Sequence, residues 1–112
     1  MALNRSPQNP ITAKDIATYE RDGCVVLRGV CNSDWIDRLL PVAMRLAADK
    51  EDFGLLPSYP GRYMARTIPE FRELAFEGPL AEAACRVMGS REARFFFDEI
   101  FAKPPRSSER TI

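Results

Sequence analysis

Residues 93–103 have the sequence ARFFFDEIFAK, which is the strongest strand signal in the chain. Side chains of an extended strand alternate between two faces. One face would carry Phe95, Phe97, Glu99, Phe101 and Lys103, and the other would carry Phe96, Asp98, Ile100 and Ala102. Both faces are largely apolar over the first half, so the strand is expected to be covered on both sides.

Helical patterns precede this strand. Leu80, Ala83, Ala84, Val87 and Met88 form an apolar stripe between the Gly78-Pro79 break and Gly89, which predicts a helix that ends at Gly89. Pro69, suited to a first helical position, predicts a short helix before that break. A longer stripe from Trp35 to Ala47 predicts a helix of about four turns, with Asn32 or Ser33 as its N-cap, that continues through Pro41.

A short helix over residues 13–22 is predicted near the N-terminus. Thr12 is a good N-cap, Asp15 follows three residues later, and Gly23 can end the helix in a left-handed conformation. The next residues, Cys24 to Leu27, form a β-branched apolar run that indicates a short strand. Residues 1–10 are predicted to be a flexible tail, and residues 51–68 a long irregular connection.

The charge balance excludes several classes of partner. Lysine and arginine together number 16, as do aspartate and glutamate, so the net charge is zero. This leaves no basic excess for nucleic acid or for an anionic membrane surface. No apolar run approaches the roughly 20 residues that span a bilayer, and the N-terminus has no secretory signal. We therefore expect a cytoplasmic protein.

The sequence has three cysteines and no histidine. Cys24, Cys31 and Cys85 are widely spaced and do not form a disulfide framework. We expect them to be small buried thiols in a reducing compartment. With no histidine, a zinc site with four protein ligands is not available.

Two stretches of the chain carry a family resemblance: ITAKDIATYERDGCVVLRGV at residues 11–30 and PLAEAACRVMGSREARFFFDEIFAKPP at residues 79–105. In this order and spacing they are similar to the N-terminal half of the phytanoyl-CoA dioxygenase family, and the likeness spans residues 11–112. Members of this family are non-haem Fe(II), 2-oxoglutarate-dependent oxygenases that hydroxylate small molecules or acyl-thioesters.

The resemblance implies an α+β fold, in which N-terminal helices pack on the first strands of an incomplete jelly-roll (double-stranded β-helix). It also implies an iron site made by a His-x-Asp pair and a distant histidine, with positions left open for 2-oxoglutarate and oxygen. In the family the His-x-Asp pair follows the Lys-Pro-Pro loop closely. Here residues 103–105 are followed by RSSERTI, so the ligands are expected just beyond Ile112.

The resemblance also suggests site residues for an intact enzyme. Arg62 lies where a basic residue of the family can bind the carboxylates of 2-oxoglutarate, although it can equally be a solvated loop arginine. Phe97, Glu99 and Phe101 would face the substrate, with plain core packing of the two phenylalanines as the alternative. For Glu99 the alternative is a place near the strand edge, where it meets solvent or an arginine.

Two hypotheses remain open at this stage. The chain is the N-terminal part of an Fe(II)/2-oxoglutarate-dependent dioxygenase, which is inactive and binds neither cofactor tightly alone. Alternatively, it is a non-catalytic binding or assembly module derived from that fold. In both cases an unpaired edge of the FFFDEIF strand would favour self-association.

Overall fold

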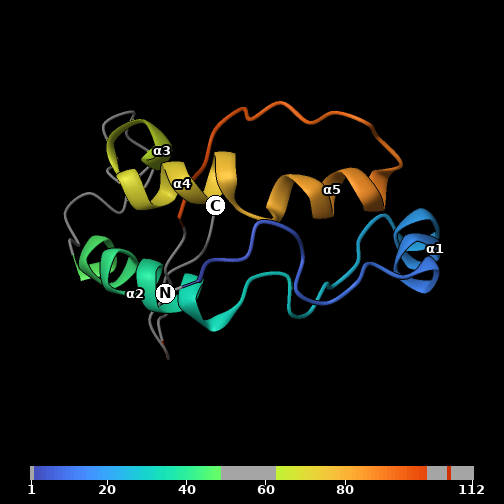
Figure 1. The fold of residues 1–112 in the computed structure, drawn as a ribbon, viewed down its shortest axis with the longest axis horizontal. Coiled ribbons are helices and arrows are strands. Elements are labelled where there is room, and N and C mark those ends of the chain that lie inside the picture. Colours follow the sequence, from blue (N-terminus) through green and yellow to red (C-terminus); the bar gives the residue numbers. More distant parts are fainter. Residues whose placement is uncertain (1, 49–62, 101–105, 107–112) are drawn as a thin grey trace.

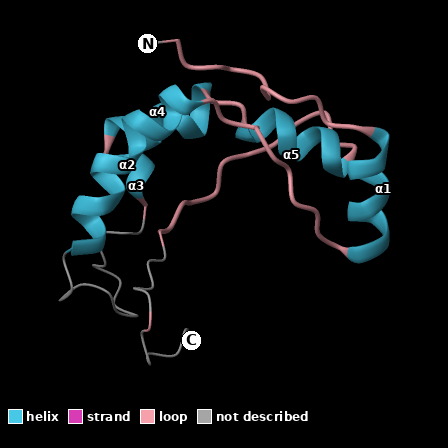
Figure 2. Ribbon diagram, turned by 90° about the horizontal axis from the view of Figure 1, so that it is seen from below, coloured by secondary structure: helices cyan, strands magenta, loops and turns pink. Residues whose placement is uncertain are grey.

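The computed structural model describes residues 2–48, 63–100 and 106, and these contain five helices. They are α1 (Ala13–Asp22), α2 (Ser33–Ala48), α3 (Met64–Thr67), α4 (Pro69–Glu77) and α5 (Leu80–Met88). Helix α4 contacts α2, α3 and α5, and α5 also contacts α1. The helices therefore follow an arch, with α2, α3 and α4 at one end and α1 and α5 at the other (Figures 1 and 2).

The predicted helix boundaries are confirmed where local signals are strong. In α1 the Thr12 hydroxyl accepts a hydrogen bond from the backbone N–H of Asp15, and the Asp15 carboxylate accepts one from the N–H of Thr12. These Thr12 donors, the backbone N–H first, lower the pKa of Asp15. Gly23 ends the helix with a φ of 75°, a left-handed conformation that glycine adopts without steric cost.

The helices on both sides of the Gly78-Pro79 break also agree with prediction. Pro69 lies in the first turn of α4, Gly78 ends it, and Gly89 ends α5 with a φ of 68°. Helix α2 continues through Pro41, as its apolar stripe predicts. The short helix α3 was not predicted, because its four residues lie in a stretch that the sequence marks as irregular.

The predicted α+β fold is wrong for the part of the chain that the structure describes. Neither Cys24–Leu27 nor residues 93–100 form a strand there, and Glu99 alone has a β-bridge. Both segments have strand-forming side chains. However, no hydrogen bond joins the backbone of residues 24–27 or 93–97 to another described residue. A strand exists only when a neighbouring strand takes up its N–H and C=O groups, so the described residues form no jelly-roll.

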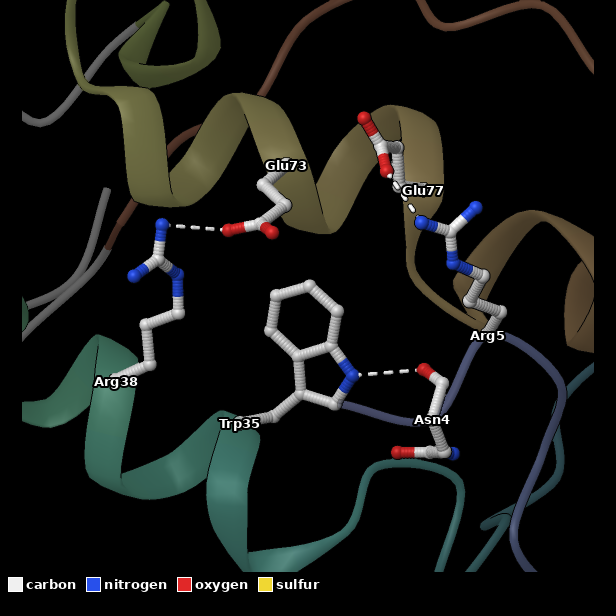
Figure 3. A network of polar contacts seen from close by, with 6 residues as sticks. All are labelled: Asn4, Arg5, Trp35, Arg38, Glu73 and Glu77. Atoms are coloured by element: carbon white, nitrogen blue, oxygen red, sulfur yellow. Dashed lines mark hydrogen bonds and ion pairs between the residues drawn. The ribbon is translucent and has the colours of Figure 1, made fainter. Parts of the chain in front are cut away.

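The described core is small, and its buried apolar residues come from three helices. Helices α2 and α3 contribute Trp35, Val42, Met64 and Ala65, and α5, which contacts α1 and α4, contributes Ala83 and Val87. The indole of Trp35 is only 1% exposed and lies between α2 and α4. On one side of it an ion pair of 2.6 Å joins Arg38 to Glu73 (Figure 3). Trp35 therefore packs α2 against α4.

The first ten residues, predicted to be a flexible tail, contact the segment that precedes α2. The carbonyl of Asn4 accepts a hydrogen bond of 2.8 Å from the Trp35 indole (Figure 3). The Asn4 side chain accepts one from the N–H of Asn32 at 2.9 Å and donates one to the carbonyl of Val30 at 2.7 Å. Asn4 thus satisfies backbone groups beside the start of α2, and the mobility of this segment stays a prediction.

The three cysteines are free thiols, but they are not equally buried. Cys24 is exposed, which corrects the expectation of a buried thiol there, because its segment has no covering neighbour. Cys31 and Cys85 are half-buried, and burial raises the pKa of the Cys31 thiol. Among the described helices, none combines the length and apolar character needed to cross a lipid bilayer.

The Asn4 contacts generate a stability prediction. Replacing Asn4 with alanine removes the acceptor of Asn32 and the donor to Val30, so Asn4→Ala should lower the free energy of unfolding by about 1–3 kcal/mol. Urea denaturation measures this difference. Gln8→Ala is the matched control, since Gln8 is exposed and contacts Val30 only through its backbone N–H. Equal stability of the two variants would contradict the role given to Asn4.

Candidate functional site

An apolar groove lies between the extended segment after α5 and the helices α3 and α4. Its volume is about 570 Å³. The helices contribute Met64, Phe71, Leu74, Ala75, Phe76, Leu80 and Ala81, and the extended segment contributes Ala93, Arg94, Phe95, Phe96, Asp98 and Glu99. The helices thus provide an apolar floor, and the charged groups of the lining all come from the extended segment.

Asp98 fixes one end of this extended segment to α3. Tyr63 precedes α3 with a φ of 54°, and its side chain makes no capping hydrogen bond. The carboxylate of Asp98 supplies the acceptor instead, receiving the N–H of Ala65 at 2.9 Å, and the carbonyl of Asp98 receives the N–H of Tyr63 at 2.9 Å. The groove wall therefore depends on a contact between residues 33 positions apart.

Aromatic rings join the segment to the groove floor. The ring centroids of Phe95 and Phe76 are 5.3 Å apart, and those of Phe97 and Tyr63 are 6.0 Å apart. Both distances fall within the range of favourable ring pairs. Phe96 also lines the groove but is 86% exposed, with its centroid 4.9 Å from that of Phe97. Phe95 thus contacts α4 and Phe97 contacts the residue that precedes α3, whereas Phe96 is largely open to solvent.

The backbone between these rings has unused hydrogen-bonding capacity. Residues 93–97 run as an extended trace from the end of α5 back toward α3 (Figure 1). No described residue pairs with their backbone N–H and C=O groups. Such a segment has the same property as the edge of a sheet, because it presents donors and acceptors that another extended chain can match.

Only part of the predicted site can be placed. Arg62 and Phe101 lie outside the described residues. Glu99 is half-buried and lines the groove, whereas Phe97 contacts Tyr63 and is not among the lining residues. The single strand face that was expected to hold them is not formed among the described residues. Their role toward a substrate stays a prediction.

The residues present do not fit the iron site that the resemblance implies. The chain has no histidine, so the imidazole donors of the facial triad are missing from it. In the described ranges no three residues among histidine, cysteine, aspartate and glutamate come together as metal ligands. Asp98, the acidic residue best placed at the groove, already accepts the N–H of Ala65.

Sequence reasoning missed the residues that build the groove. Asp98 was assigned only to a strand face, yet it caps α3. Phe76 was not singled out, although it is 58% exposed and its ring lies under the guanidinium of Arg72 at 5.1 Å. The available signal was an exposed aromatic residue on α4 with a cation one turn earlier, a spacing at which helical side chains meet.

Comparison of the chain with protein-family models, with curated proteins and with solved structures gives no match.

The capping role of Asp98 can be tested at one amide. Asp98→Ala removes the acceptor of the Ala65 N–H, and losses of such caps cost about 0.5–2 kcal/mol. Exchange of the Ala65 amide hydrogen, followed by NMR, should be faster in Asp98→Ala than in the unmodified chain. Asp98→Asn keeps an oxygen acceptor and should preserve most of the protection.

Glu92→Ala is the control for this experiment, because the Glu92 side chain is exposed and lies on the same segment. If Ala65 exchanges equally fast in Asp98→Ala and Glu92→Ala, Asp98 does not cap α3.

Proposed function

We propose that this chain is a binding module that takes up an extended polypeptide along residues 93–97. The observation that supports the proposal most strongly is an extended backbone with unmatched hydrogen-bonding groups beside an apolar groove. Addition of a strand to a free edge gives affinity through the main chain, and neighbouring pockets select the side chains. The chain would then act in assembly rather than in catalysis.

The dimensions of the groove support a polypeptide with large apolar side chains. A volume of about 570 Å³ falls in the range of sites that enclose several such groups. An incoming strand beside residues 93–97 directs alternate side chains to the groove and to solvent. The ligand class is therefore an extended segment in which apolar residues alternate with polar ones.

Selection from a random peptide library tests this proposal. The selected peptides should alternate apolar and polar residues, and on binding they should slow amide hydrogen exchange at residues 93–97, since those N–H groups gain partners. Phe76→Ala should weaken binding about tenfold or more, because a buried aromatic contact contributes roughly 1–3 kcal/mol. Titration by calorimetry gives the affinity.

Met44→Ala provides the matched control for this variant. Met44 on α2 is 61% exposed, close to the 58% of Phe76, and it does not line the groove. Peptides that bind both variants equally, or that leave exchange at residues 93–97 unchanged, contradict the proposal.

A second candidate function is favoured by the family resemblance of the sequence. The stretches at residues 11–30 and 79–105 resemble the N-terminal half of the phytanoyl-CoA dioxygenase family. On this proposal the chain is a catalytically incomplete portion of a cytoplasmic Fe(II)/2-oxoglutarate-dependent dioxygenase that hydroxylates a small molecule or an acyl-thioester.

The chain alone should not turn over 2-oxoglutarate. With added Fe(II) and 2-oxoglutarate we expect no succinate above a control without protein, because the imidazole ligands are missing. Succinate formation by the purified chain would contradict the assignment of an incomplete enzyme.

The genomic DNA after the codon for Ile112 separates the two candidates. An open reading frame that continues past this codon and encodes His-x-Asp at once supports the oxygenase portion. A stop codon with no His-x-Asp codons nearby leaves the binding module as the supported function.

A further inference from the structure

The extended segment carries opposite charges at its two ends. Arg91, Glu92 and Arg94 precede the three phenylalanines and have a net positive charge, and Asp98 and Glu99 follow them. Arg94 is exposed, and Asp98 is half-buried where it caps α3. A second strand that runs antiparallel to this one is complementary to it when its own acidic end meets Arg94 and its own basic end meets Asp98. A second copy of the same segment satisfies both conditions.

We infer that the extended polypeptide bound by residues 93–97 is the same segment of a second copy of this chain. The inference rests on the proposed binding function and names its partner. Two copies related by a two-fold axis would pair their segments antiparallel, so that each supplies the neighbour that the other lacks. This arrangement is self-complementary, as a two-fold interface requires, and it closes at a dimer.

Charge and ring positions define the register of this pairing. With the two-fold axis at Phe96, Arg94 of one copy lies opposite Asp98 of the other, and Phe95 lies opposite Phe97 of the other. Directly opposed residues share a face of the sheet, and opposite charges or aromatic rings there stabilise the pair. The Asp98 carboxylate can accept from Arg94 while it holds the N–H of Ala65, because a carboxylate offers about four lone-pair sites.

Phe96 is the most exposed ring of the segment, so it gains the most cover from a second copy. Phe95 and Phe97 already contact Phe76 and Tyr63, whereas Phe96 is 86% exposed. On the two-fold axis the two copies of Phe96 cover each other. A parallel pairing in register would instead place Arg94 beside Arg94 and Asp98 beside Asp98, and such like-charged neighbours are destabilising.

Helix α2 presents the competing surface. Ile36, Leu40 and Met44 are exposed and recur every four residues, which places them on one stripe of the helix. This stripe is apolar, but a helix satisfies its own backbone and offers no hydrogen-bonding groups to a partner. Association through α2 therefore lacks the backbone pairing and the charge pairing that the 93–98 segment provides.

Sedimentation equilibrium of the full chain tests the inference. The unmodified chain should show a monomer–dimer equilibrium. Arg94→Glu should weaken dimerisation about tenfold or more, since it turns two attractive cross-strand pairs into repulsive ones. Arg91→Glu makes the same charge change on the same segment but outside the five paired residues 94–98, and it should have a smaller effect. Leu40→Glu should leave the dimer intact.

An isotope-mixed dimer tests the register directly. Contacts between the rings of Phe95 and Phe97 across labelled and unlabelled copies support the inference. A chain that is monomeric at all concentrations, or a dimer weakened by Leu40→Glu and not by Arg94→Glu, overturns it. If library peptides still slow exchange at residues 93–97 in such a monomer, the binding function stands and only the identity of the partner is wrong. If the library peptides do not slow exchange there, the binding function and the dimer are both wrong.

Discussion

Backbone hydrogen bonding divides this chain into two kinds of segment. A helix pairs its N–H and C=O groups internally, whereas an extended segment needs a second extended segment for the same purpose. Local sequence signals mark the ends of α1, α4 and α5. Residues 24–27 and 93–97 have the side chains of strands, but no described backbone pairs with either of them. The exposed aromatic groove is a consequence of this missing pairing.

The helical part is held together by few residues. Trp35 fills the space between α2 and α4, and its indole also binds the carbonyl of Asn4, so that one side chain links the N-terminal residues to the core. Asp98 links the segment after α5 to the core in a similar way, because its carboxylate caps α3. These two contacts position the groove, because they fix the helices that form its floor and the segment that forms its wall.

The sequence predicted the helices well because their signals are local. Thr12 with Asp15, the prolines at positions 69 and 79, and the glycines at positions 23 and 89 each act within a few residues of where they stand. The strands were predicted from equally clear patterns, but strand formation depends on a partner that no local pattern reveals. The groove was not predicted for a similar reason, since Asp98 and Ala65 meet only in the folded chain.

A binding function follows from the need of an extended backbone for a hydrogen-bonding neighbour. The backbone of residues 93–97 has no described hydrogen-bonding partner, and its aromatic rings are partly exposed. A strand that pairs with this backbone therefore stabilises it. Residue-resolved amide hydrogen exchange at low and high protein concentration tests this account most directly. We predict protection in α1, α2, α4 and α5 at both concentrations, and protection of residues 93–97 only at high concentration. Protection of residues 93–97 equal to that of the helices in the dilute monomer would contradict the account.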